Sequence, residues 1–250
     1  MALPNQNTTG TAIPVALISE WTAGRLIQAV QKDTITLDDG TEASPVDFFA
    51  ALFEVPDDPM NPPPGSYFAV MILNALRTPL SLVEMSTPLV HGYQDAYPAV
   101  SNLKGSTLTM HEIPASRSHP LDPTATRYGA GMWGFSSAGN GVEGAVALCY
   151  NGNLTDPSTK QAVGPFVGVS WRFGTIFWSD RYGVTADVAG KYSSLDGFYQ
   201  KTIVSASDST FSEIGGDVAV MCRYAYRDLQ SGRGVCSCLM VYVRYKLPGE

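Results

Sequence analysis

The chain has 250 residues, of which 44% are hydrophobic and 16% charged, a composition that excludes an intrinsically disordered protein. This length suits one large β domain or two small ones. The net charge of −7 at pH 7 argues against a nucleic-acid-binding protein, because such a protein needs a basic surface to replace the counterions of the phosphate backbone.

The acidic charge is concentrated in the first part of the chain. Residues 1–100 contain three basic and eleven acidic side chains, whereas residues 101–250 contain thirteen and twelve. The opening sequence MALPNQNTTG has neither the basic nor the apolar part of a secretory signal. No apolar run reaches the ~18 residues of a membrane-spanning helix. We therefore expect a protein made in soluble form without a signal peptide and released by a non-signal route.

The first predicted element is a helix in residues 13–30, IPVALISEWTAGRLIQAV, whose apolar residues recur at helical spacing. This segment is either a helix or strand packed on the domain, or an amphipathic segment that seeks a membrane. The sequence PDDPMNPPPG at 56–65 follows and holds five prolines, so it cannot be a helix or a central strand. We therefore divide the chain into an N-terminal arm, residues 1–65, and a β domain, residues 66–250.

After the proline-rich loop, the hydrophobic pattern changes to that of strands. Segments rich in β-branched and aromatic residues are separated by glycine-containing turns at 67–74, 106–113, 142–150, 162–173, 217–226 and 234–245. A short second helix is predicted in KYSSLDGFYQK at 191–201. Many short strands with few helices predict an all-β fold, an antiparallel β-sandwich with one or two short flanking helices.

The cysteines do not indicate a disulfide scaffold or a metal site. There are four in the chain, Cys149, Cys222, Cys236 and Cys238. This is too few for a scaffold in a chain of this length, and small buried apolar residues are the simplest interpretation. A disulfide between Cys222 and either Cys236 or Cys238 is the alternative in an oxidising compartment. No histidine accompanies them at zinc-ligand spacing, so no metal is expected.

The sequence offers little support for an enzyme. GAGMWG at 129–134 satisfies the G-x-G-x-x-G pattern, but it continues into FSSAGNG, which cannot begin the helix that a dinucleotide site needs. GFSSAG at 134–139 misses the nucleophile-elbow pattern by one residue. We expect no catalytic residue, no cofactor and no enzymatic activity. A hydrolase built from scattered carboxylates is the alternative.

The most informative segment is SWRFGTIFWSDRYGV at 170–184, which holds five of the 26 aromatic residues in the chain. Gly174 interrupts the strand period, so Phe177, Trp178 and Tyr182 should lie at or beyond the end of a strand, where rings are harder to bury. Trp and Tyr favour a membrane interface, and the faces of their rings attract choline. A hydrophobic cluster under a long loop is the alternative interpretation.

This segment resembles the membrane loop of the actinoporins, a family of pore-forming cytolysins that bind sphingomyelin. FWSD at 177–180 is similar to the aromatic-aromatic-Ser-Asn run of the family, and Ser170 stands where the family has a serine that lines the headgroup pocket. Arg172 replaces a proline of that pocket. The resemblance spans about 67–245 in order and pattern, with few identities, and the Arg-Gly-Asp motif of the family is absent.

The predicted helix near residue 195 adds to the resemblance, because the family has a short helix with a cluster of tyrosines at this place. The resemblance implies a membrane-binding surface that consists of Phe177, Trp178, Tyr182 and Trp171. It also implies a lipid-headgroup pocket that consists of Ser170, Tyr192, Phe198 and Tyr199.

The function that the resemblance implies is that of a pore-forming toxin, a cytolysin of insecticidal or related type. Segment 13–30 would leave the sandwich and insert into the membrane, and several copies would form a homo-oligomer, because one such helix has no polar partner in lipid. The implied partner is a target-cell membrane with sphingomyelin or another choline lipid, or glycans, and not a nucleic acid.

Two other functions remain open at this point. Fungal fruit-body lectins share the sandwich without making pores, so a non-lytic carbohydrate-binding module is the first alternative. A self-assembling structural protein of capsid type is the second, because it also suits an acidic, proline-rich β chain without a signal sequence.

Overall fold

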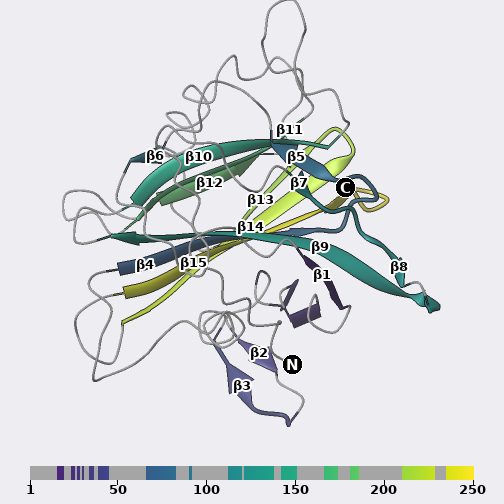
Figure 1. Ribbon diagram of the computed structural model, residues 1–250, viewed down its shortest axis with the longest axis horizontal. Coiled ribbons are helices and arrows are strands. Elements are labelled where there is room, and N and C mark those ends of the chain that lie inside the picture. Colours follow the sequence, from purple (N-terminus) through teal and green to yellow (C-terminus); the bar gives the residue numbers. More distant parts are fainter. Residues whose placement is uncertain are drawn as a thin grey trace, which may run out of the picture.

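The computed structural model describes a little under half of the chain. The described residues are 16–19, 24–25, 27–28, 30, 34–36, 39–44, 66–82, 90–91, 112–119, 121–137, 142–150, 166–173, 181–185, 210–228 and 235–250. They form two large β-sheets that pack face to face, together with a small two-stranded sheet (Figure 1). The predicted all-β sandwich is therefore confirmed.

The larger sheet has seven strands in the order β1-β9-β4-β15-β14-β13, with β8 paired to β9. All of its pairs are antiparallel except β4 with β15, which are parallel. The strands are β1 (Ala16–Ser19), β4 (Ser66–Asn74), β8 (Arg117–His119), β9 (Asp122–Ser137), β13 (Thr210–Gly215), β14 (Val218–Asp228) and β15 (Val235–Tyr245).

The second sheet has six strands in the order β12-β11-β10-β5-β7, with β6 paired to β10. Its strands are β5 (Leu80–Leu82), β6 (Val90–His91), β7 (Glu112–Ile113), β10 (Val142–Cys149), β11 (Phe166–Phe173) and β12 (Arg181–Thr185). A separate antiparallel pair is formed by β2 (Ile35–Thr36) and β3 (Glu42–Ala43).

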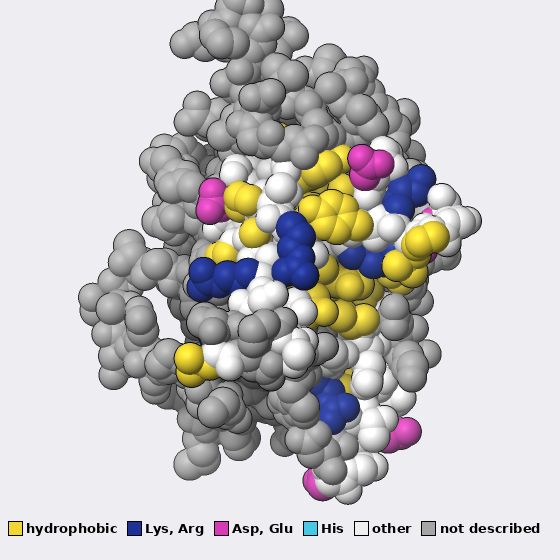
Figure 2. Space-filling model, turned by 90° about the vertical axis from the view of Figure 1, so that its right-hand side faces the viewer, with side chains coloured by type: hydrophobic (Ala, Val, Ile, Leu, Met, Phe, Trp, Pro, Cys, Tyr) yellow, Lys and Arg dark blue, Asp and Glu magenta, His cyan; other side chains and the backbone are white. Residues whose placement is uncertain are grey.

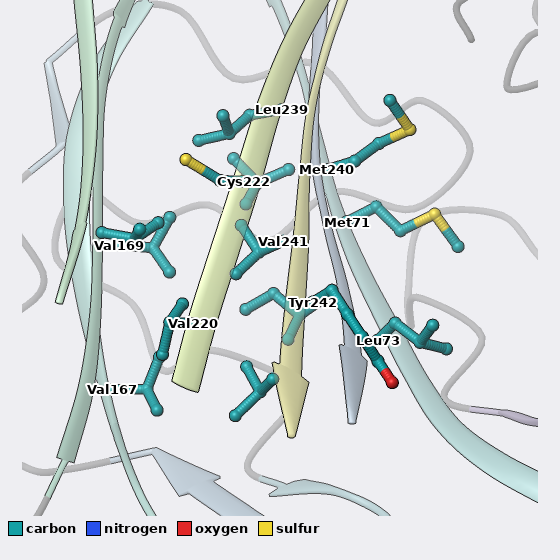
Figure 3. Close-up of a cluster of buried hydrophobic side chains, with 14 of the residues drawn as sticks. Met71, Leu73, Val167, Val169, Val220, Cys222, Leu239, Met240, Val241 and Tyr242 are labelled. Carbon is teal, nitrogen blue, oxygen red and sulfur yellow. The ribbon is translucent and has the colours of Figure 1, made fainter. Parts of the chain in front are cut away.

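The main core lies between the two large sheets. Alternate residues of a strand share a face, and the inward set on β14 and β15 includes Val220, Cys222 and Val241. Figure 3 shows these side chains directed toward Val167 and Val169 of the other sheet, and all five are at most 1% exposed. Complete burial of such side chains stabilises the fold by about 1.5–3 kcal/mol each. This explains why β-branched residues dominate these strands.

The cysteine predictions can be compared with this core. Cys149 and Cys222 are buried, with exposed fractions of 1% and 0%. Cys222 lies opposite Val241 in the β14–β15 register, so the predicted alternative of a disulfide from Cys222 to Cys236 or Cys238 is wrong. For Cys149 and Cys222, the interpretation as small buried apolar residues is confirmed.

The outer face of the seven-stranded sheet is buried as well. Met71, Leu73 and Met240 point away from the six-stranded sheet in Figure 3, yet each is at most 3% exposed. Val30 and Ile35 belong to the same continuous hydrophobic cluster. β1 is an edge strand of the seven-stranded sheet, whereas Figure 1 shows β2 and β3 on the side of that sheet opposite the six-stranded sheet. The described residues around Val30 and Ile35 thus form a third layer, packed on the sandwich.

The prediction of one continuous helix over residues 13–30 is wrong. Residues 16–19 form β1, which extends the seven-stranded sheet by pairing with residues 127–130 of β9, and of the described residues in this segment 24–25, 27–28 and 30 are helical. The unpaired edge of β9 offers backbone hydrogen bonds that outweigh a moderate helical pattern. Residues 45–65 lie outside the described residues, so the domain boundary at the proline-rich loop stays a prediction.

At one end of the sandwich, hydrogen bonds join the side chain of Asn74 to backbone groups of neighbouring segments. The Nδ2 group of Asn74 donates to the carbonyl oxygens of Thr78 and Pro114 at 3.0 and 2.9 Å, and its Oδ1 accepts from the amide of Leu76 at 3.0 Å. A Cβ atom at Gly129 would lie 1.8 Å from the Pro114 carbonyl oxygen. Only glycine permits this close approach, which fixes β9 against the segment before β8.

Candidate functional site

The predicted site segment, residues 170–184, is divided between two neighbouring strands. β11 ends at Phe173 and β12 begins at Arg181, and these strands pair antiparallel with Trp171 opposite Tyr182. Residues 174–180 connect the two strands and lie outside the described residues. The segment is therefore a pair of adjacent strands with a seven-residue connection between them.

Trp171 and Tyr182 are core residues. Trp171 is 0% exposed and Tyr182 is 5% exposed. Trp171 continues the inward series of Val167 and Val169 on β11. The ring of Tyr182 lies 5.9 Å from the ring of Tyr224 in β14, at an interplanar angle of 36°. The prediction that these two rings contact a membrane is wrong, because strand pairing holds both rings between the sheets, away from the surface.

Ser170 lies on the opposite face of β11, and it is buried there too. Its side chain is 0% exposed, and its Oγ donates to the carbonyl oxygen of Gly183 at 3.4 Å. Ala145 and Thr185, on the same face of the neighbouring strands, are also 0% exposed. The side chain of Ser170 is therefore covered on the outer face of the six-stranded sheet, and its role in a headgroup pocket with Tyr192, Phe198 and Tyr199 stays a prediction.

Arg172 and Arg181 form the last pair of the β11–β12 ladder before the connection. They lie opposite one another in register, and both side chains are half-buried. Glu143 of β10 is the partner of Arg172 on its other side, and His91 of β6 is the partner of Glu143. Cross-strand partners project from the same face of a sheet. The register thus places two arginines side by side at the base of the connection, with Glu143 next to Arg172.

The sequence alone did not reveal this arginine pair. Arg172 was recognised only as a replacement for proline, and Arg181 was not singled out. The two residues stand at about equal distances from the centre of the 174–180 connection. This symmetry is the mark of an antiparallel pair, and it would have predicted their contact once the connection was located.

The remaining predicted site residues lie outside the described residues. They are Phe177, Trp178, Tyr192, Phe198 and Tyr199. Phe177 and Trp178 belong to the connection between β11 and β12, and the other three follow β12 in the chain. Their roles in membrane and headgroup binding stay predictions.

The described part of the chain contains neither a cluster of metal ligands nor a membrane-spanning helix. No group of three or more His, Cys, Asp or Glu side chains within it could hold a metal ion. Within the same residues, no helix is both long and apolar enough to cross a bilayer.

Comparison with known proteins gives a distant likeness among solved structures. No protein-family model matches the chain, and no curated protein matches it. Among solved structures, the chain is similar to the crystal structure of the lipid-binding protein Nakanori. The sequence identity is 13%, 71% of each chain is covered, and the TM-score is 0.40. At this TM-score the likeness assigns neither a family nor a function to the chain.

Proposed function

We propose that the protein binds lipid membranes through the connection between β11 and β12. The observation that carries this proposal is the anchoring of both flanking strands by the buried pair Trp171 and Tyr182. The connection therefore starts and ends at a rigid part of the sandwich. Phe177 and Trp178 belong to this connection by sequence, and on our proposal their rings enter the membrane interface, where aromatic residues are effective.

The headgroup phosphate is the part of the lipid that the base of this connection would recognise. Arg172 and Arg181 stand in register directly before and after the connection. Guanidinium groups bind phosphate with strong, charge-assisted and often bidentate hydrogen bonds. In the resembled family a proline occupies the place of Arg172. We therefore propose that this chain recognises a phospholipid with a larger contribution from phosphate and a smaller one from choline.

The finer part of the proposal is permeabilisation. The N-terminal segment, which includes β1 and the buried Val30, would leave the outer face of the seven-stranded sheet and enter the bilayer. Its departure breaks the backbone pairing of β1 with β9, and lipid would then solvate its apolar side chains. Several copies together would form the pore wall. On this proposal the protein is a non-enzymatic cytolysin that acts at a target-cell membrane.

The test is vesicle binding followed by dye leakage. Vesicles of phosphatidylcholine alone, with sphingomyelin, and with phosphatidylserine are incubated with the protein, and bound protein and released dye are measured separately. We expect binding to all three and leakage from at least one. Phe177→Ala and Trp178→Ala should reduce binding. The matched control is Tyr245→Ala, which removes an exposed ring (42%) that lies outside the segment.

The outcomes separate the alternatives. No binding to any vesicle rules out the lipid proposal, and binding to immobilised glycans in its place would indicate a carbohydrate-binding module. Binding without leakage would keep the lipid proposal and remove pore formation. Large particles formed without lipid would indicate a structural protein.

A further inference from the structure

The β8–β9 ribbon extends beyond the rest of the seven-stranded sheet. β9 has 16 residues, but β4 pairs only with residues 129–137 and β1 only with residues 127–130. Within the described residues, the first part of β9, 122–126, therefore pairs with β8 alone. Figure 1 shows this two-stranded ribbon projecting from the right-hand side of the sandwich.

The side chains of the ribbon are suited to a partner that is acidic and partly apolar. Leu121, in the turn of the ribbon, is 91% exposed. Arg117 is exposed and lies opposite Arg127, an arrangement of like charges that is unfavourable by itself. The Nε of Arg127 is buried and has no hydrogen-bond partner among the described residues. Figure 2 views the molecule from this end and shows Lys and Arg side chains next to hydrophobic ones.

A surface of opposite charge lies at the turn between β2 and β3. The sequence places three acidic residues between positions 38 and 42, and Asp39 and Glu42 are exposed. The Asp39 carboxylate accepts hydrogen bonds from the amide and the Oγ1 of Thr41 at 2.9 and 2.6 Å. These bonds lower the pKa of Asp39, and the carboxylate is charged at neutral pH with or without them. Figure 1 shows this turn below the seven-stranded sheet, away from the β8–β9 ribbon.

We propose that the β8–β9 ribbon of one copy docks on the β2–β3 turn of a second copy. Arg117 would face the acidic turn, and Leu121 would lose its exposure to water. Because two different surfaces meet, the contact is heterologous and leaves one surface of each kind free at the ends. Further copies add in the same way and give a chain, or a ring if the rotation closes. The contact does not depend on lipid binding.

A second copy fits the ribbon better than a membrane does, because of where the ribbon points. β9 leads from the ribbon to Ser137 over about 50 Å of extended strand. β10 starts a few residues after Ser137, and Val142 of β10 pairs with Phe173, after which the 174–180 connection begins. The ribbon and the proposed membrane-binding connection therefore lie at opposite ends of the sandwich.

The experiment is sedimentation velocity of the full chain at low salt, about 20 mM, over a range of concentrations. The wild type should associate, and raising the salt to about 300 mM should weaken the association by screening. Arg117→Glu and Glu42→Lys should each weaken it by roughly three- to tenfold. Arg77→Glu makes the same charge change at an exposed arginine outside both surfaces, and it should leave association unchanged.

An equimolar mixture of the two variants is the decisive measurement. The ribbon of Arg117→Glu is now acidic and faces the turn of Glu42→Lys, which is now basic. The basic ribbon of Glu42→Lys faces the acidic turn of Arg117→Glu, as in the wild type. The association constant of the mixture should therefore lie within about twofold of that of the wild type, whereas each variant alone associates more weakly. Leu121→Ser should weaken association with no change in melting temperature, because this side chain is 91% exposed in the single copy.

Three results would overturn the proposal. The first is a monomer at every concentration up to about 1 mM at low salt. The second is a mixture that associates no better than its two components. The third is a loss of binding to anionic vesicles in Arg117→Glu with unchanged self-association, which would assign the ribbon to lipid.

Discussion

The segment 170–184 contains two kinds of aromatic residue that the sequence presents as one group. Trp171 and Tyr182 lie in paired strands and are 0% and 5% exposed. Phe177 and Trp178 lie in the connection between those strands. A ring within a paired strand has its direction fixed by the alternation of the strand, and it is buried wherever that face meets another sheet. Enrichment of aromatic residues therefore does not by itself indicate a binding surface.

The largest expected effect comes from substituting a buried aromatic residue of the segment, Trp171. Trp171→Ala should lower the free energy of unfolding by about 3–5 kcal/mol, because it removes the largest fully buried side chain and leaves a cavity between the sheets. Urea unfolding followed by circular dichroism measures this loss. A variant with wild-type stability and weaker vesicle binding would assign Trp171 to the membrane-binding surface, and it would contradict the distinction between buried and connection aromatic residues.

The next largest effect is expected from substituting an aromatic residue of the connection, Trp178. Trp178→Ala should leave the unfolding free energy unchanged and weaken partitioning into vesicles by about 1–3 kcal/mol, or one to two decades in affinity. Vesicle co-sedimentation and thermal melting of the same preparation check both parts. If the variant melts several degrees lower and binds normally, the connection is part of the core and the distinction between the two halves disappears.

A smaller effect is expected from Arg172 and Arg181, the last pair of the β11–β12 ladder before the connection. Arg172→Gln and Arg181→Gln should each weaken binding to phospholipid vesicles by about two- to fivefold. They should also reduce the dependence of binding on salt, since each removes a cation that on our proposal contacts phosphate. The measurement is a titration with vesicles at several salt concentrations. An unchanged salt dependence in both variants would show that the arginine pair stabilises the ladder and does not contact lipid.

The smallest effect on stability is expected at the ion pair of Arg244 with Glu250, outside segment 170–184. Because this pair has no proposed role in lipid binding, it is a reference for the other variants. Arg244 forms a bidentate ion pair with Glu250, which lowers the pKa of Glu250 from 4.5 to about 2. Because the folded-state pKa is depressed, this contribution to stability is present above about pH 4.5 and is lost as the pH falls through about 2.

Glu250→Gln should therefore be slightly less stable than the wild type at pH 5, and the difference should shrink as the pH approaches 2. Acid unfolding curves of the two proteins measure this difference, and vesicle binding should not change. A difference in stability that stays constant down to the lowest pH would mean that the carboxylate charge is not its cause.

Local patterns predicted the strands that carry the core. The expected strands at 67–74, 142–150 and 234–245 agree with β4, β10 and β15 to within one residue at each end. Their alternation and β-branched residues are local properties, and a strand buried in a sandwich needs little else. The glycine-rich segment 129–134, which the sequence argues against as a dinucleotide site, lies within β9.

The failures concern contacts between residues far apart in the chain. The helical spacing in 13–30 was real, but the edge of β9 more than a hundred residues later decided the structure of Ala16–Ser19. Tyr182 was placed beyond a strand because the length of the connection after Gly174 was not known. The arginine pair needed the register of two strands. None of these facts is present in a window of ten or fifteen residues.

The parallel pairing of β4 with β15 has a consequence for how the protein is made. Tyr67 pairs with Cys236, so β4 emerges from the ribosome long before its neighbour exists. At typical rates of synthesis, the delay is on the order of 10–30 s. During that time one edge of an apolar strand is open, and it is a place where nascent chains can aggregate or recruit a chaperone. Yield in the cell should thus depend on chaperone supply more than the stability of the finished sandwich suggests.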